Sequence, residues 1–156
     1  MPARSAELEE LFCFDLYAAS RAVTSVYRPL LAELGLTYPQ YLVLIALWRD
    51  HTQTVKQLTE ALQLDYGTLT PLLRRLESKG LVTRTRRPED ERSVDVALSA
   101  AGKSMRKRAQ HIPGVIQAAV GLDRDQIVGL QSTLRVLTAA ATGYLPVTQP
   151  RRVGNS

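Results

Sequence analysis

Apolar residues recur every three or four positions over the first part of the chain, which is the spacing of an amphipathic helix. They are Leu8, Leu11, Phe12, Tyr17, Ala22, Val23, Val26, Tyr27, Leu30 and Leu31. This stripe is wider than one neighbouring helix would cover. We expect one long helix from about Ser5 to Leu34, kinked near its end by Pro29 and stopped by Gly35.

A second helix is predicted after the sequence LTYPQ. Thr37 and Gln40 have the spacing of a capping box, and Pro39 falls in the first turn, where proline is tolerated. The residues that follow, through about Trp48, are apolar nearly all round. This pattern predicts a buried helix.

Two shorter helices are predicted next. Thr54 and Gln57 form another capping box, which begins the helix VKQLTEALQ. A tight turn at residues 64–65 connects it to a helix over about residues 66–79, which Gly80 ends. Two short helices joined in this way form a helix-turn-helix motif.

A hairpin is predicted after this motif. Residues 81–86 and 92–99 alternate between apolar and polar side chains, and the charged sequence RPEDE lies between them. We expect two antiparallel strands with a charged tip, which is the wing of a winged helix-turn-helix.

The rest of the chain predicts two further helices. One begins at Ser99 and is disturbed at Pro113 and Gly114, and the other begins at the capping pair Asp123 and Gln126. The fold class is therefore mainly α: a winged helix-turn-helix with additional N- and C-terminal dimerisation helices. We expect a single domain over residues 1–144, with a DNA-binding core at about 52–99 and a flexible tail over 145–156.

Charge is unevenly distributed along this chain of formal net charge +5. Residues 70–110 carry 11 basic and 5 acidic side chains, a balance of +6, whereas residues 1–69 carry 5 and 8, a balance of −3. A concentrated basic segment indicates a polyanionic partner, most often nucleic acid, although a solvated helix face would carry similar charge. The helix-turn-helix and wing favour DNA.

The residues suited to DNA contact lie at the start of the second motif helix and on the wing. A recognition helix faces base edges with its N-terminal residues, and a wing reaches an adjacent minor groove. We expect Asp90 to orient Arg92, because phosphate repels a carboxylate. The candidate DNA-binding residues are Tyr66, Thr68, Thr70, Pro71, Arg74, Arg75, Arg86, Asp90 and Arg92.

Cys13 is the only cysteine in the chain. A free cysteine in a helix is most often a small core residue. Here Tyr17 lies one turn further on the same face, and Tyr27 lies on nearly the same face about 21 Å along a straight helix. If two such helices pair antiparallel across a two-fold axis, Tyr27 of one subunit can lie beside Cys13 of the other, and Tyr38 could join it. Phenolic hydroxyls that donate to sulfur favour the reactive thiolate.

Composition excludes several other classes. One cysteine cannot form an internal disulfide, and two separated histidines predict no metal site, so we expect no cofactor. The longest apolar run, YLVLIALW, is far too short to span a bilayer, and the first residues lack a secretory signal. We therefore expect a cytoplasmic protein without a membrane partner.

Two segments together resemble a known family. Residues 54–102, which include YGTLTPLLRR, are similar to the winged-helix core of the multiple-antibiotic-resistance (MarR) regulators, whose wing typically reads D-x-R, here Asp90-Glu91-Arg92. Residues 11–48 resemble the organic hydroperoxide resistance regulators within that family. The residues that match their motif are Cys13, Tyr17, Tyr27 and Tyr38. The resemblance covers about residues 8–110, and Tyr66 departs from it, since a serine is expected there.

The resemblance implies a homodimeric repressor, not an enzyme, that binds a double-stranded DNA operator in front of a peroxidase gene. An organic hydroperoxide as inducer would oxidise Cys13 and release the operator. The chain would be of the one-cysteine type, in which a small-molecule thiol can react with the oxidised sulfur.

Two other functions remain open at this point. A regulator of the same fold could respond to a small aromatic ligand, with Cys13 a bystander. A one-cysteine peroxidase would turn over peroxide steadily with a reductant, but it would need no basic hairpin.

Overall fold

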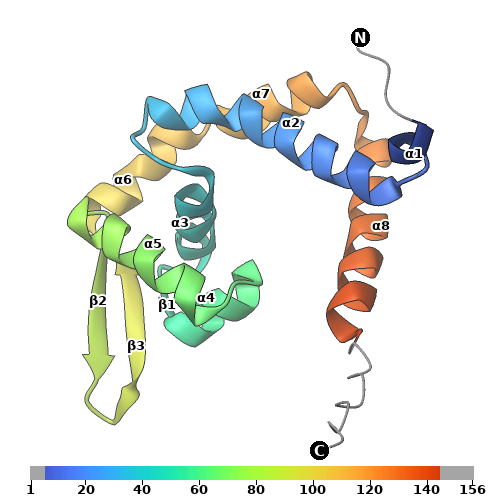
Figure 1. Ribbon diagram of the computed structural model, residues 1–156. Coiled ribbons are helices and arrows are strands. Elements are labelled where there is room, and N and C mark those ends of the chain that lie inside the picture. Colours follow the sequence, from blue (N-terminus) through green and yellow to red (C-terminus); the bar gives the residue numbers. More distant parts are fainter. Residues whose placement is uncertain (1–5, 145–156) are drawn as a thin grey trace, which may run out of the picture. The chain divides into compact units, whose positions relative to one another are not determined.

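The computed structural model describes residues 6–144 (Figure 1). By their contacts the described residues fall into two compact units that divide between Val120 and Gly121. The first unit contains helices α1 to α7 and a three-stranded sheet, and the second contains helix α8 (Arg124–Gly143). The tail expected over 145–156 lies outside the described residues, and the single domain over 1–144 stays a prediction.

The first helix differs from the expectation. In place of one helix from about Ser5, the chain forms α1 (Ala6–Glu9) and α2 (Phe12–Ala32), because Leu11 adopts an extended conformation between them. Pro29 lies inside α2, close to its end. Gly35, at φ +68°, allows the turn in which Leu36 donates its N–H to the carbonyl of Leu31.

The three central helices follow the capping patterns. Helix α3 (Tyr38–Asp50) begins after the capping pair Thr37 and Gln40, and α4 (Val55–Leu62) begins after Thr54 and Gln57. Helix α5 (Tyr66–Ser78) is the second helix of the motif. Its apolar side is buried in the core together with the side of α3 that carries Val43, Leu44 and Leu47, so the helix-turn-helix prediction is confirmed.

The sheet has one strand more than predicted. Strands β2 (Val82–Arg87) and β3 (Asp90–Leu98) form the wing, which projects away from the helices (Figure 1). Strand β1 (Thr52–Thr54), which we did not predict, pairs antiparallel with β3 and gives the order β1-β3-β2. A register irregularity falls between Arg86 and Arg87, near the wing tip.

The base of the wing is fixed to α3 and to α6 (Ala100–Ala109). Ser99 donates its hydroxyl to the carbonyl of Gly80 at 2.5 Å, and Trp48 donates Nε1 to the carbonyl of Gly102 at 2.9 Å. A Cβ at Gly102 would lie 2.0 Å from the carbonyl oxygen of Leu81, so only glycine allows this approach.

The sequence predicted two helices after the wing, but the structure has a further one, α7 (Ile112–Val120), between them. Pro113 is the second residue of α7, and proline is tolerated in the first turn of a helix. The proline that was expected to disturb a helix therefore lies at the start of a new one. Helix α7 lies alongside α2 (Figure 1). No helix among residues 6–144 is both long enough and apolar enough to cross a membrane.

Candidate DNA-binding surface and redox site

The N-terminus of α5 is organised by Asp65. Its carboxylate accepts the backbone N–H of Thr68 at 2.7 Å and the Thr68 hydroxyl at 3.0 Å. These two hydrogen bonds hold the pKa of Asp65 below its usual value, the backbone bond being the larger cause. The hydroxyl hydrogen of Thr68 is therefore engaged within the protein, while the ring of Tyr66, 56% exposed, stands free at the helix start.

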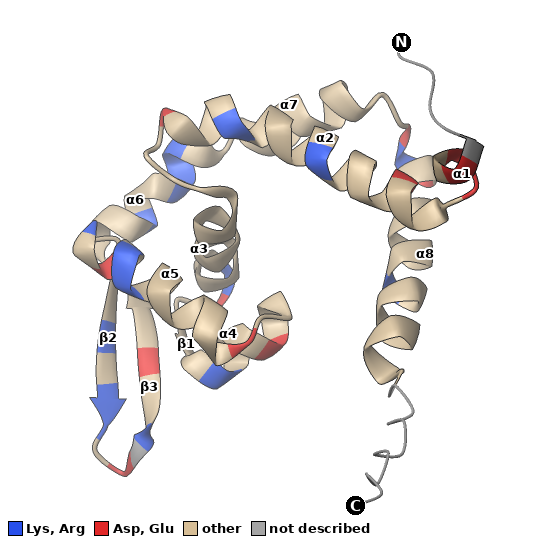
Figure 2. Ribbon diagram, in the orientation of Figure 1, with Lys and Arg blue, Asp and Glu red and all other residues tan. Residues whose placement is uncertain are grey.

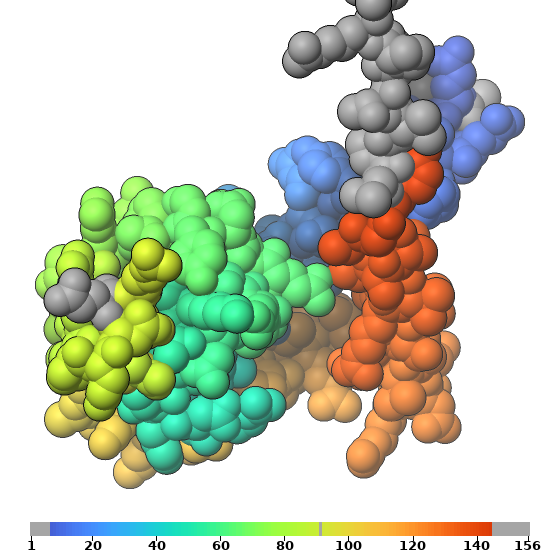
Figure 3. Space-filling view, turned by 90° about the horizontal axis from the view of Figure 1, so that it is seen from below, coloured from blue at the N-terminus to red at the C-terminus, as the bar shows by residue number. Residues whose placement is uncertain are grey.

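A groove of about 430 Å³ lies between this helix and the wing. Tyr66 and Thr70 of α5 line it together with the cationic side chains Lys56, Arg84 and Arg92. Figure 3 views the first unit from the side of the wing tip, where α4, α5 and the wing border one another. Lys56 and Arg92, together with the hydroxyl groups, suit this groove to a phosphate backbone.

Ion pairs engage part of the positive charge of the wing. Arg87 bonds the Asp95 carboxylate across the hairpin, with its Nη2 at 2.9 Å, and this hydrogen bonding raises the pKa of Arg87. Arg84 donates to Glu77 of α5 at 2.6 Å, which lowers the pKa of that carboxyl group. Both arginines are thereby committed to the protein scaffold.

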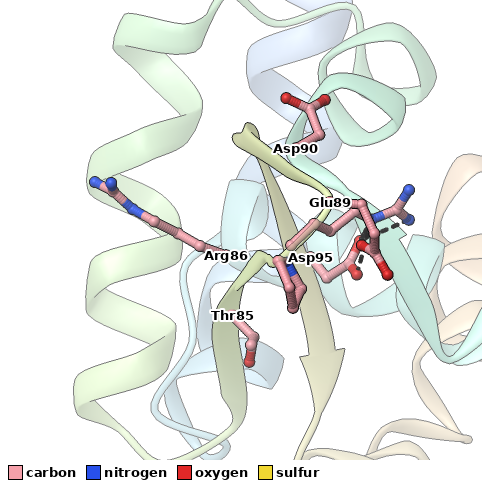
Figure 4. A pocket seen from close by; sticks show the side chains of 7 residues that line it. Thr85, Arg86, Glu89, Asp90 and Asp95 are labelled. Atoms are coloured by element: carbon pink, nitrogen blue, oxygen red, sulfur yellow. Dashed lines mark hydrogen bonds and ion pairs between the residues drawn. The ribbon is translucent and has the colours of Figure 1, made fainter.

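Other cations remain directed outward. Figure 4 shows the side chain of Arg86 extending away from the carboxylates of Glu89, Asp90 and Asp95. Arg74 and Arg75 are exposed on α5, and Figure 2 shows basic residues (blue) on α5, β2 and α6. Exposed guanidinium groups of this kind can reach phosphates or guanine.

Asp90 shapes the wing tip through the main chain. It accepts the backbone N–H of Arg92 at 3.1 Å and the hydroxyl of Ser93 at 2.8 Å. The Ser93 bond is the largest of the causes that hold the pKa of Asp90 below its usual value. Asp90 therefore fixes the backbone from which the Arg92 side chain extends.

The thiol lies at the start of α2. Cys13 is exposed and is the second residue of the helix. The first turn of a helix leaves backbone N–H groups without helical partners, and the helix dipole there favours negative charge.

Tyr17, one turn beyond Cys13, is held by a neighbour that the sequence pattern did not single out. Arg21 donates Nη1 to the Tyr17 phenol oxygen at 3.1 Å, and its guanidinium carbon lies 5.5 Å from the ring centroid. Because Arg21 occupies an acceptor site on the oxygen, the phenol hydrogen remains available to another acceptor. Cys13, Tyr17 and Arg21 recur every four residues, which places them along one face of α2.

The other two candidate tyrosines lie together. Tyr27 and Tyr38 have ring centroids 4.7 Å apart, and Tyr41 lies 6.0 Å from Tyr27. Trp48 extends this aromatic row, 5.9 Å from Tyr41. Burial raises the pKa of Tyr27, and Tyr38 and Tyr41 raise it further, so its phenol remains a hydrogen-bond donor.

The structure therefore divides the predicted redox residues into two pairs. Cys13 and Tyr17 lie at the N-terminal end of α2, and Tyr27 and Tyr38 lie near its C-terminal end. The 14 residues from Cys13 to Tyr27 correspond to about 21 Å of helix. A single chain does not bring the two pairs together.

Three contributors to these sites were missed. Arg84 could have been found from the alternation of β2, which places it on the face of Arg86, two residues away. Lys56 and Arg21 carried no comparable signal, because their roles depend on neighbours in the folded chain. Within residues 6–144 no group of three or more His, Cys, Asp or Glu side chains is placed to hold a metal ion.

Comparison with known proteins identifies the family. A sequence model of the MarR family matches residues 36–94. The organic hydroperoxide resistance transcriptional regulator of Bacillus subtilis (strain 168) is 47% identical over 131 residues, which cover 84% of this chain and 89% of that protein. This relative is a transcriptional regulator and not an enzyme.

Solved structures agree with this relationship. Reduced AbfR bound to DNA matches with a TM-score of 0.74 and 31% identity, covering 87% of this chain and 95% of the other. Overoxidized AbfR bound to DNA matches with a TM-score of 0.72 and 30% identity, covering 86% and 95%. AbfR is a protein of Staphylococcus epidermidis. From the identity to the Bacillus protein, the winged helix-turn-helix and these structural matches, the chain belongs to the MarR family of transcriptional regulators.

Proposed function

We propose that this protein is a DNA-binding repressor that senses organic hydroperoxides through oxidation of Cys13 and then releases its operator. One observation carries the proposal: the single thiol is exposed in the first turn of α2, in a chain 47% identical to an organic hydroperoxide resistance regulator. A free cysteine is most often a small core residue, but Cys13 is exposed, so that interpretation does not fit here.

The proposed reaction is a nucleophilic displacement on the peroxide. The Cys13 thiolate attacks one peroxide oxygen, so an S–O bond forms as the O–O bond breaks. The products are a sulfenic acid and an alcohol, whose oxygen takes the proton that the thiol released. With no second cysteine in the chain, the sulfenic acid can react with a small external thiol, form a sulfenamide or oxidise further.

We propose that the active form is a homodimer in which two α2 helices pair antiparallel. Large apolar side chains are exposed along α1 and the first turns of α2, and a second copy would bury them. They are Leu8, Leu11, Phe12 and Leu16, exposed by 38–64%. In such a pairing, Tyr27 and Tyr38 of one subunit would donate hydrogen bonds to the Cys13 sulfur of the other.

Oxidation would weaken DNA binding through the geometry of this dimer. Two recognition helices of a dimer read half-sites about 34–36 Å apart. A sulfenic acid or a mixed disulfide adds polarity or bulk where the subunits pack. A small rotation between the subunits would then displace the helices from successive major grooves.

DNA-binding titrations of wild-type protein and the Cys13→Ser variant, with and without cumene hydroperoxide, test the proposal. The operator is a duplex selected from a random library by the reduced wild-type protein. We expect Cys13→Ser to bind as wild type does and to remain bound in peroxide, whereas wild type dissociates. Release of the Ser variant by peroxide would place the sensor elsewhere, and steady consumption of peroxide with a dithiol reductant would indicate a peroxidase.

A further inference from the structure

Lys79 connects the recognition helix to the segment that carries the tyrosine pair. It is the C-cap residue of α5, and its Nζ donates to the carbonyl oxygen of Gly35 and, at 3.1 Å, to Oε1 of Gln40. Gly35 lies in the turn after α2, and Gln40 lies in the first turn of α3. One ammonium group therefore contacts the turn and α3 from the end of the helix proposed to read DNA.

The two acceptors belong to the structure that supports Tyr38. Gln40 is 2% exposed, and its Oε1 also accepts the backbone N–H of Thr37, the residue before Tyr38. Gly35 closes the C-terminal end of α2 by donating its N–H to the carbonyl of Ala32, and the helix dipole favours a cation at this end. A displacement of Tyr38 away from Tyr27 would move Thr37 and Gln40, and with them the acceptors of Lys79.

Hydrogen bonds transmit such a displacement better than the apolar contacts of α5. The buried leucines of α5 hold it against the core without directional preference. The bonds of Lys79 depend on distance and angle, so they fix the end of α5 relative to the turn. Burial of Gln40 makes its hydrogen bond with Lys79 harder to replace, since a buried amide is destabilised when it gives up a partner that water cannot replace.

We infer that Lys79 is a coupling residue, which transmits a rearrangement of the Tyr27–Tyr38 pair to the recognition helix. The inference rests on the proposed function for the nature of the signal. Lys79 lies at the far end of α5 from Tyr66 and belongs to none of the residues proposed to contact DNA. The buried leucines of α5 hold the helix in its reduced-state position, and Lys79 couples that position to the turn after α2 and to α3.

The chain offers a matched control at the same end of α2. Arg108 of α6 donates Nη2 to the carbonyl of Glu33 at 3.3 Å. It is a cation near the C-terminus of α2, as Lys79 is, but it extends from a helix that is not part of the helix-turn-helix motif. Its removal costs a similar capping contact and leaves the link to α5 intact.

The first experiment measures how much cumene hydroperoxide lowers affinity for the selected operator. Coupling between sites is typically 5–150-fold, so we expect a drop of about 10-fold or more in wild type, in Lys79→Arg and in Arg108→Met. In Lys79→Met we expect a drop below about 3-fold and a reduced-state affinity within about 3-fold of wild type, because only the coupling is lost. A wild-type drop in Lys79→Met, or loss of DNA binding in its reduced state, overturns the inference.

The second experiment needs neither peroxide nor DNA. Amide hydrogen exchange over residues 66–78 is compared with and without Tyr38→Ala, first in wild type and then in Lys79→Met; if the methionine variant does not fold, Lys79→Gln replaces it. We expect Tyr38→Ala to speed exchange in α5 only while Lys79 is present. An equal effect in both backgrounds overturns the inference. If wild type neither binds DNA nor responds to peroxide, the proposed function fails, and this second comparison still decides the role of Lys79.

Discussion

At the scale of single residues, the availability of a side chain for DNA depends on its partners within the protein. Arg87 and Arg92 both lie on the wing, yet Arg87 is bound to the carboxylate of Asp95, whereas Asp90 holds only the main chain of Arg92. To bind a phosphate, Arg87 must first give up its ion pair with Asp95. The free energy of that pair offsets part of the free energy gained from the phosphate contact. Equal charge on neighbouring residues therefore does not mean equal contribution to binding.

This difference predicts unequal effects of two alanine substitutions. Arg92→Ala should weaken operator binding and reduce the slope of log affinity against log salt by about one unit, since one phosphate contact is lost. Arg87→Ala, as the matched control, should change the slope by less than half as much. Titrations at several salt concentrations measure both, and equal slopes for Arg92→Ala and wild type would mean that Arg92 does not touch DNA.

At the scale of elements, local patterns predicted most of the fold. The capping pairs at Thr37, Thr54 and Asp123 lie where the sequence placed them, because a capping box is formed by residues three apart. Strand β1 was missed, since three residues carry no readable period and pair with a distant strand. The break at Leu11 was missed because the apolar stripe continues through it.

The N-cap of α5 predicts a specific dependence of stability on pH. Hydrogen bonds from Thr68 lower the pKa of Asp65 from 3.8, so its contribution is present above that value and is lost as pH falls through the lower folded-state pKa. Asp65→Asn keeps a capping oxygen that does not titrate. The stability difference between wild type and this variant, measured by urea unfolding, should shrink as pH falls from about 5 to 2.

The comparison with Asp65→Asn removes the titration of all other carboxyl groups, which both proteins share. Asp90 and Glu77 also have a lowered pKa, but their contributions cancel in the difference. A difference that stays constant over this pH range would mean that the Asp65 carboxylate does not stabilise the folded state.

At the scale of the whole molecule, the proposed sensor needs two chains. Cys13 and Tyr27 lie about 21 Å apart along α2. Sequence spacing predicted this separation, because a helix has a fixed rise per residue. It did not predict the contacts of Arg21, Lys56 and Lys79, which depend on how side chains meet in the folded chain.

Mixed dimers test whether Tyr27 acts across the subunit interface. In one dimer, one chain carries Cys13→Ser and the other Tyr27→Phe, so the remaining thiol faces an intact Tyr27 and should react at the wild-type rate per thiol. In the second dimer, one chain carries both changes, so the remaining thiol faces a phenyl ring and should react more slowly, because its hydrogen-bond donor is lost.

Mass spectrometry under limiting cumene hydroperoxide measures the oxidation rate of the remaining thiol in each dimer. If the first dimer is the slower one, Tyr27 acts within its own chain. If both react at the wild-type rate, Tyr27 contributes packing only.

The close approach at Gly102 gives the wing the mechanics of a lever. Its fulcrum lies where the backbone of Leu81 meets α6 with no side chain between them, held by the bond from Trp48. The arm is β2, whose six residues extend about 20 Å. A tilt of about 5° at the fulcrum would carry the tip through about 2 Å, more than the roughly 0.5 Å range over which a hydrogen bond keeps its strength. Small shifts between α3 and α6, too slight to disturb the core, would therefore be amplified into the loss or gain of individual contacts at the far end of the hairpin.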